Sequence, residues 1–184
     1  MKLNQQHILV GVTGGIAAYK TATFVRLLKK QGAEVRVIMT SAAEKFITPL
    51  TMATLSENEV GLDLFDQLPL HDVRHIHWAE WANLVVVAPA TANTLAKAAN
   101  GLADDLLSST LLAVQCPLVM VPAMHHQMWT HPATQRNIKT LKADGVHIMP
   151  PAEGDLASGD VGPGRMPEPE QVLQFILELN KQAV

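Results

Sequence analysis

The feature that most constrains this fold is the regular alternation of short apolar runs with segments of helical period. Residues 7–12, 34–39 and 83–90 are apolar runs of strand length, and each is followed by a segment with helical spacing of its apolar positions. Parallel strands need long crossover connections, which are usually helices. The pattern therefore predicts an α/β fold with a doubly wound parallel sheet, Rossmann-like or flavodoxin-like, and helices on both faces.

The same reading assigns the remaining elements. The expected strands are residues 7–12, 34–39, 83–90, 117–123 and 145–151. The expected helices are residues 16–31, a segment from Ser41, a segment that begins at Pro49 with Thr48 as its N-cap, and residues 91–99, 104–114, 132–143 and 167–180. Residues 150–169, rich in glycine, proline and acidic side chains, are expected to form a mobile loop or flap. We expect a single domain over residues 1–184.

Composition narrows the classes of function. The chain has 184 residues, of which 48% are hydrophobic, and a formal net charge of −3 without a basic cluster, so a nucleic-acid partner is not expected. No apolar run is long enough to cross a membrane, and the polar start does not resemble a secretory signal, so we expect a cytoplasmic protein without a membrane partner. The single cysteine, Cys116, excludes an internal disulfide and is expected to be an inert core residue.

Ligands of such folds bind at the carboxyl ends of the strands, and the first candidate there is the segment GVTGGIAAYK, residues 11–20. Thr13 offers a hydroxyl, Gly14 and Gly15 let the backbone approach a ligand, and Ile16 opens a helix whose free N–H groups attract anions. This arrangement is typical of a phosphate cradle, but for a glycine pair alone a tight turn without a ligand is the better explanation. After the second strand, Thr40 and Ser41 are expected either to bind phosphate or only to cap a helix.

The second candidate is the small-residue segment 88–113, APATANTLAKAANGLADDLLSSTLLA. Its first turn brings together the polar side chains of Thr91, Asn93 and Thr94 with small residues that leave space for a flat molecule close to the backbone. Close packing between helices also favours alanine-rich faces, and composition alone favours that alternative.

The third candidate is the histidine-rich segment HDVRHIHWAEWANL, with His71, His75 and His77. Their spacing places them on different faces of a helix, and no cysteine or carboxylate motif completes a metal site, so no metal is expected. One histidine near its working pKa is a better candidate for proton transfer, with an ordinary solvated or core histidine as the alternative.

The fourth candidate is the segment PAMHHQMWTHPATQRN, residues 122–137. Two methionines and a tryptophan directly after a core strand form an apolar wall with polar donors between them, as pockets for small ligands require. A core cluster of the same residues is the alternative.

Taken together, these motifs resemble a known family. The segments GVTGGIAAYK, APATANTLAKAANGLADDLLSS, HI at 75–76, PAMHHQMW and ASGDVGPGRM occur in this order in the homo-oligomeric flavin-containing cysteine decarboxylases. Among them the chain is most similar to the phosphopantothenoylcysteine decarboxylases of coenzyme A biosynthesis, without the ligase domain that is often fused to them. The resemblance implies FMN as cofactor, and trimers, often assembled further into dodecamers, whose sites are shared between subunits.

The resemblance also implies roles for individual residues. His75 matches the proposed catalytic base, and Ser158 stands where coenzyme A pathway members carry a proton-donating cysteine. His125 stands where the family has an asparagine that holds the substrate. The expected substrate-binding residues are Ala123, Met124, His125, Met128 and Arg165. The expected cofactor-binding residues are Thr13, Gly14, Gly15, Ile16, Thr40, Ser41, Pro89, Ala90, Thr91, Ala92, Asn93 and Thr94.

Three functions stay open at this point. The first is decarboxylation of 4′-phosphopantothenoyl-L-cysteine to 4′-phosphopantetheine, through a thioaldehyde and an enethiol. The second is oxidative decarboxylation of a C-terminal peptidyl cysteine, as in lantibiotic maturation, which Ser158 favours because an alcohol is a far weaker acid than a thiol. The third is a non-catalytic flavin-binding regulatory oligomer. A related flavin prenyltransferase shares the second segment but lacks the His75 and PAMHHQMW features.

Overall fold

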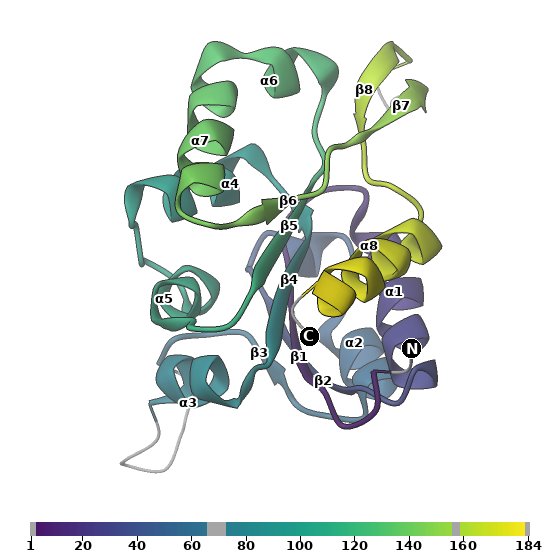
Figure 1. Cartoon of the computed structure of the whole chain (residues 1–184), viewed down its shortest axis with the longest axis vertical. Coiled ribbons are helices and arrows are strands. Elements are labelled where there is room, and N and C mark those ends of the chain that lie inside the picture. Colours follow the sequence, from purple (N-terminus) through teal and green to yellow (C-terminus); the bar gives the residue numbers. More distant parts are fainter. Residues whose placement is uncertain (1–2, 66–72, 156–158, 183–184) are drawn as a thin grey trace.

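The computed structural model describes residues 3–65, 73–155 and 159–182, which form one α/β sandwich (Figure 1). Six strands make its sheet in the order β3-β2-β1-β4-β5-β6, and all of their pairings are parallel. The strands are β1 (His7–Val12), β2 (Glu34–Met39), β3 (Val60–Gly61), β4 (Leu84–Ala90), β5 (Leu118–Pro122) and β6 (His147–Ile148). This is the Rossmann strand order, and without the two-residue β3 it is the flavodoxin order, so the predicted fold class is confirmed.

Helices cover both faces of the sheet (Figure 1). One face carries α1 (Ala18–Lys30), α2 (Pro49–Ser56) and α8 (Pro169–Gln182). The other carries α3 (Arg74–Trp81), α4 (Ala92–Asn100), α5 (Leu106–Ala113) and α7 (Pro132–Ala143). None of the helices in the described part of the chain is long and apolar enough to span a bilayer.

The core follows from the alternation of side chains along the buried strands. Val10 of β1 faces the α1 and α8 layer, whereas its neighbour Leu9 faces the α5 and α7 layer, and neither has any exposed surface. All seven residues of β4 are buried, as expected for a central parallel strand covered on both faces. The helix boundaries also follow local chemistry: the Thr48 hydroxyl accepts a hydrogen bond from Thr51 N, so the predicted cap of α2 is confirmed.

Several elements differ from the expectation. The predicted flap is not irregular throughout, because β7 (Ala152–Asp155) and β8 (Val161–Arg165) pair there as an antiparallel hairpin. The predicted helix from Ser41 is only a 3₁₀ turn, η1 (Ala43–Lys45), and the last predicted strand is limited to β6. The short helix α6 (His126–Thr130), α3 and β3 were not predicted. These elements are short, and their sequences lack a sustained period.

Candidate active site

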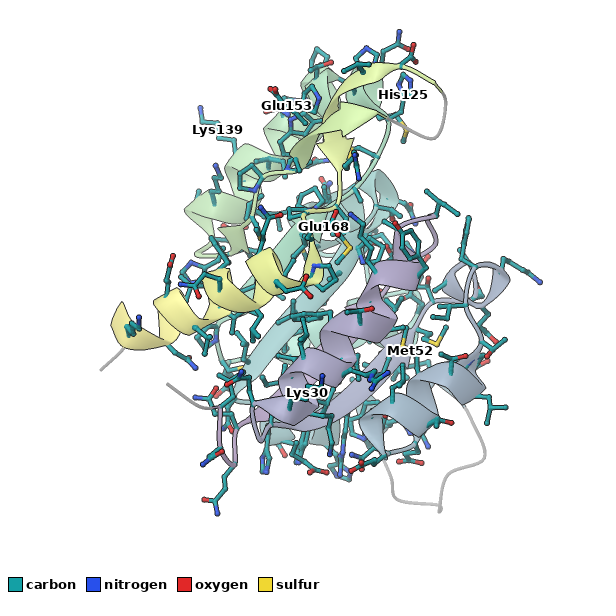
Figure 2. The ribbon with its side chains drawn as sticks, turned by 90° about the vertical axis from the view of Figure 1, so that its right-hand side faces the viewer. Lys30, Met52, His125, Lys139, Glu153 and Glu168 are labelled. Atoms are coloured by element: carbon teal, nitrogen blue, oxygen red, sulfur yellow. The ribbon has the colours of Figure 1, made fainter. Side chains whose placement is uncertain are left out.

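A cavity of about 800 Å³ lies at the carboxyl edge of the sheet, where the strand order reverses between β1 and β4. Its walls come from the segments that follow β1, β2, β4 and β5, and from the end of β8. The described residues that line it are Thr13, Gly14, Gly15, Ile16, Ala17, Tyr19, Lys20, Thr40, Ser41, Ala42, Thr91, Ala92, Asn93, Thr94, Lys97, Asp105, Ala123, Met124, His125, Met128, Gly164, Arg165 and Met166. In Figure 2, His125 and Glu168 lie toward this end of the molecule, and Lys30 and Met52 lie toward the other.

The glycine turn forms one wall, and its two glycines differ. A Cβ on Gly14 would lie 2.4 Å from the Cβ of Ala42 and 2.9 Å from its carbonyl carbon, so only glycine fits against the segment after β2. A Cβ on Gly15 would meet only the methyl of Thr91, at 3.9 Å. Among the described residues no side chain caps α1, and its first turn carries no acidic residue. The first three N–H groups of α1 donate to carbonyl oxygens of residues 15–17, so the positive end of the helix dipole and the N–H groups of the glycine turn before it suit an anion in the cavity.

Thr13 holds this turn to the neighbouring strand. Its buried hydroxyl donates to the carbonyl oxygen of Pro89 at 2.7 Å and accepts from Thr91 N at 3.1 Å. Its hydroxyl hydrogen is therefore used inside the protein, although Thr13 lines the cavity as predicted. Thr40 and Ser41 also line the cavity, and the Thr40 hydroxyl accepts from Ala43 N, the first residue of η1, at 3.3 Å.

Helix α4 supports both readings of the small-residue segment. Its start lines the cavity with Thr91, Ala92, Asn93 and Thr94, and the Thr91 hydroxyl caps the helix by accepting from Thr94 N. The rest of α4 packs against α7 and α5. Pro89 and Ala90 belong to the buried strand and are not among the described lining residues, so they stand behind the cavity wall.

Two members of an ion-pair group between α4 and the start of α5, Lys97 and Asp105, line the cavity. Lys97 contacts both Asp104 and Asp105, and Asp105 caps α5 by accepting from Ser108 N at 2.7 Å. The hydrogen bonds that Lys97 donates to the two carboxylates raise the pKa of Lys97. Burial raises the pKa of Asp105, but the hydrogen bonds from Lys97 and Ser108 outweigh it and leave the pKa below its usual value.

A second charged contact fastens the end of the flap to α1. The buried ammonium of Lys20 donates to the carbonyl oxygen of Met166 at 2.8 Å and to Glu168 Oε1 at 2.7 Å. This hydrogen bond lowers the pKa of Glu168. Arg165 lines the cavity, and its guanidinium lies 3.8 Å from the same carboxylate. The flap and the glycine turn therefore meet at one wall.

The residues expected to bind the substrate come together at the cavity. Ala123, Met124, His125, Met128 and Arg165 all line the cavity. The Met124 N–H donates to Gly164 O at 2.9 Å, which joins the segment after β5 to β8. His125 also contacts the flap, because its Nε2 lies 2.7 Å from Asp160 Oδ2.

His75 is the predicted site residue that the structure places elsewhere. It lies half-buried on α3, which packs against α5 at the opposite end of the molecule from α6 (Figure 1). None of the described lining residues of the cavity belongs to α3, so His75 does not reach the cavity of its own chain. Ser158 and His71 lie outside the described residues.

Sequence reasoning missed several lining residues. Tyr19, Lys20, Lys97, Asp105 and Met166 line the cavity but were not expected there. Lys97 lies three residues after Thr94 and hence on the same helix face, a spacing that could have found it. The contact of Lys20 with the flap joins segments almost 150 residues apart in the sequence, so no local sequence pattern predicts it.

Cys116 is half-buried rather than a core residue, and burial raises the pKa of its thiol. It precedes β5 at the amino end of the strand, and so lies away from the cavity, as expected.

Comparisons with known proteins identify the family. A family model described as Flavoprotein matches residues 1–181. The chain belongs to the Flavoprotein family. It is 45% identical over 182 residues to the coenzyme A biosynthesis bifunctional protein CoaBC of Haemophilus influenzae, covering 99% of this chain and 46% of that protein. It is 47% identical over 173 residues to CoaBC of Bacillus subtilis, covering 94% of this chain and 43% of that protein. The chain thus spans about half the length of these curated relatives.

Solved structures agree with this membership. A PPC decarboxylase, a cysteine-to-serine mutant complexed with pantothenoylaminoethenethiol, aligns with a TM-score of 0.87 and 32% identity, covering 97% of this chain and all of that one. The FMN binding protein AtHal3 aligns with a TM-score of 0.84 and 31% identity, covering 97% of this chain and 98% of that one. The FMN-dependent cysteine decarboxylase SpaF aligns with a TM-score of 0.78 and 34% identity, covering 88% and 91%.

Proposed function

We propose that the chain is an FMN-dependent decarboxylase that converts 4′-phosphopantothenoyl-L-cysteine to 4′-phosphopantetheine in coenzyme A biosynthesis. The observation that carries this proposal is the cavity at the strand switch point, where an uncapped helix end and an open glycine backbone meet a polar and apolar wall. Similarity to CoaBC proteins over nearly the whole chain and to a PPC decarboxylase structure supports the choice of substrate. A cytoplasmic location stays a prediction.

The cavity residues suit FMN in chemistry and in position. The phosphate would lie at the free N–H groups of the turn formed by Gly14, Gly15 and Ile16, because a helix N-terminus favours an anion. The flat ring would lie against Thr91 and Ala92, where small side chains leave the backbone accessible. When bound, FMN would supply reversible two-electron chemistry, taking up the two electrons that leave the thiol-bearing carbon of the substrate and giving them back to the enethiol to form phosphopantetheine.

The remaining residues of this chain bind and orient the substrate. The guanidinium of Arg165 and the imidazole of His125 would hold anionic groups, since both can donate charge-assisted hydrogen bonds. Met124 and Met128 would cover the apolar part of the substrate and keep water from the reacting carbon. The carboxyl group leaves as carbon dioxide, and its bonding electrons move toward the carbon that bears sulfur.

The reaction requires a base that removes a proton from the substrate. The expected base, His75, lies on α3 and does not reach the cavity of its own chain. We propose that His75 acts in the cavity of a neighbouring copy, within a trimer or a dodecamer built from trimers. The exposure of Ile16 and Tyr19, 63% and 60%, supports an interface beside the cavity. Large apolar side chains exposed together are typical of surfaces that a partner covers.

A second function is favoured by a specific residue. Ser158 is a weaker acid than the cysteine that the family resemblance implies for this position, so the reaction could stop at the enethiol. SpaF, an FMN-dependent cysteine decarboxylase, is 34% identical, and the PPC decarboxylase mutant with serine for cysteine is complexed with an ethenethiol. These relatives support a reaction that stops at the enethiol, and oxidative decarboxylation of a peptidyl cysteine is the alternative of this kind.

Product analysis tests both functions in one experiment. The FMN-loaded protein is incubated with phosphopantothenoylcysteine, and separately with a peptide that ends in cysteine, and the products are identified by mass spectrometry. Loss of carbon dioxide alone from the first substrate supports the proposal. Loss of carbon dioxide plus two hydrogens means that the reaction stops at the enethiol. Reaction of the peptide alone supports the alternative. A flavin-loaded protein that changes neither substrate contradicts both and favours a regulatory flavoprotein.

A further inference from the structure

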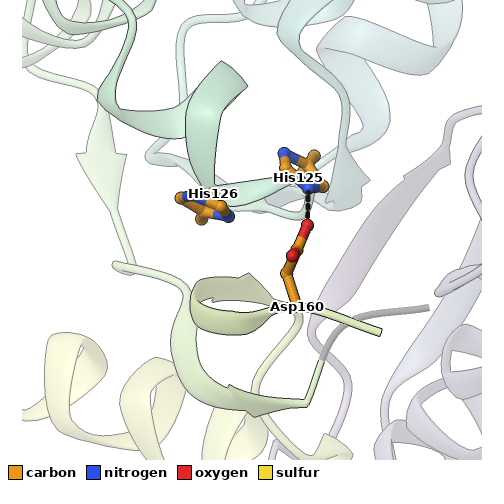
Figure 3. Close-up of side chains that lie close together, drawn as sticks. All are labelled: His125, His126 and Asp160. Carbon is orange, nitrogen blue, oxygen red and sulfur yellow. Dashed lines mark hydrogen bonds and ion pairs between the residues drawn. The ribbon is translucent and has the colours of Figure 1, made fainter. Parts of the chain in front are cut away.

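The two consecutive histidines at the start of α6 meet an aspartate of the flap. His125 is the N-cap of α6 and His126 its first residue, whereas Asp160 directly precedes β8. One nitrogen of each imidazole and one carboxylate oxygen lie within 4.8 Å of one another. Figure 3 shows His126 beside the contact between His125 and Asp160, with the three side chains converging from two segments.

The hydrogen bonds of the cluster leave part of it unsatisfied. His125 Nδ1 accepts from Gln127 N at 3.2 Å, so its Nε2 is the nitrogen that faces Asp160. His126 Nδ1 is buried and has no hydrogen-bond partner among the described residues. A buried polar atom without a partner is destabilising by about 1–3 kcal/mol, and such atoms are rare in folded proteins. The His126 ring thus lies next to a carboxylate and a second imidazole with a buried nitrogen unused.

From this arrangement we propose that His125, His126 and Asp160 form a binding site for a divalent transition-metal ion of the Zn²⁺ class. Two imidazoles and one carboxylate are a donor set that suits zinc and its neighbours, whereas Mg²⁺ and Ca²⁺ prefer oxygen ligands alone. Zinc ligands in such sites lie about 2.0–2.2 Å from the ion. Asp160 is exposed and His125 is only partly buried, so these two side chains have room to turn toward an ion beside His126.

A bound ion would join two elements that form the cavity wall. The histidines belong to α6 and the aspartate to the flap, so coordination would hold the flap against α6. His125 lines the cavity, and its Nε2 would be bound to the ion instead of to a substrate. A metal ion bound here would therefore inhibit substrate binding and would take no part in catalysis. The metal site itself goes beyond the proposed function and does not depend on it, whereas its inhibitory effect rests on that function.

Metal binding is measured directly on the FMN-loaded protein. Zn²⁺ is titrated by calorimetry, and Co²⁺ is added as a spectroscopic probe whose visible absorption reports nitrogen and oxygen coordination. We expect one ion per chain. The variants His126→Asn and Asp160→Asn should each weaken binding more than about 100-fold, since loss of outer-shell partners alone weakens metal sites about 10- to 100-fold.

Matched variants separate this site from general surface binding. His147→Asn removes an exposed imidazole from β6, and Glu153→Gln removes an exposed carboxylate from the same flap, so both should bind Zn²⁺ as the parent does. Circular dichroism and flavin content report whether each variant is folded. The proposal is overturned if the parent binds no Zn²⁺ at about 1 mM, or if folded His126→Asn and Asp160→Asn proteins bind it with unchanged affinity. None of these readouts measures catalysis, so they test the metal site whether or not the protein is a decarboxylase.

Discussion

Two adjacent glycines in one turn serve different purposes. Gly14 is required by its neighbour, because any Cβ there would overlap the Cβ and carbonyl carbon of Ala42. Gly15 has space on its cavity side, where the closest contact of a Cβ would be Thr91 at 3.9 Å. The first glycine therefore serves the fold, whereas the second serves access to the cavity.

Alanine at each position should separate these two purposes. Gly14→Ala should lower the free energy of unfolding by about 1–3 kcal/mol, as overpacking in a tight core does, because backbone must move. Gly15→Ala should change it by less than about 0.5 kcal/mol. Urea unfolding of the apoprotein measures both values. Equal losses of stability in the two variants would contradict the assignment.

The difference between these glycines could not be read from the sequence. The pair itself predicted a close approach between a ligand and the backbone, and both residues line the cavity. The residue that crowds Gly14 follows β2, and parallel pairing of β1 with β2 brings it there. For the same reason the sequence offered Thr13 as a phosphate ligand, although its hydroxyl donates to Pro89 O.

Among the helices, α4 contacts the start of α5 through Lys97, which pairs with Asp104 and with the capping carboxylate of Asp105. Asp105 caps α5 through Ser108 N and receives a hydrogen bond from Lys97 of α4 at 2.7 Å. The resulting pKa is lower in the folded chain than in the unfolded one. A depressed pKa contributes stability above the unfolded value, and this contribution is lost as the pH falls through the folded value.

Replacing the carboxylate with an amide should remove this pH dependence. Asp105→Asn keeps a good cap but loses the ion pair, so it should destabilise the protein by up to about 1 kcal/mol at pH 7. The difference from the parent should shrink below about pH 4, where the aspartate is protonated in the unfolded chain. Unfolding free energies from pH 7 to pH 3 measure this, with Asp144→Asn, at an exposed position after α7, as the control. A constant difference across the range would contradict the account.

Long elements could be predicted from the sequence, and short ones could not. The boundaries of β1, β2 and α7 were predicted without error, because sustained apolar periods and clear caps mark them. In contrast, β8 has the sequence VGPGR, which has low strand propensity, and pairing with β7 determines its conformation. The five residues of α6 are also too few to show a period.

At the scale of the whole molecule, the proposed base lies outside the cavity of its own chain. Most predicted cofactor and substrate residues meet in one cavity, because strand ends of a parallel sheet share an edge. His75 does not, since α3 lies at the other end of the molecule (Figure 1). The sequence could supply the residue and its proposed role, but not its distance from the cavity. A site shared between copies of the chain would bring His75 of one copy to the cavity of another, which explains both its proposed role and its distance from its own cavity.

Complementation between two variants tests the shared site. His75→Asn removes the proposed base, and Gly15→Leu fills the proposed phosphate turn, so each protein alone should be inactive. Mixed oligomers should regain activity, because a cavity of the first variant can meet His75 of the second. Random mixing in a cyclic oligomer restores about one quarter of the sites at equal amounts. Decarboxylation assays after joint refolding measure the recovery. Failure of mixed oligomers to recover any activity would contradict the sharing of the site.

The central claim is that the cavity at the strand switch point binds FMN, and its most direct measurement is a fluorescence titration of FMN into the apoprotein. We expect saturation at one FMN per chain. Gly15→Leu should weaken binding more than about 100-fold, because its side chain occupies the anion position at the end of α1. Ala143→Leu, which adds the same side chain at an exposed position on α7, should bind FMN like the parent. An apoprotein that binds no FMN, or a Gly15→Leu protein with unchanged affinity, would contradict the account.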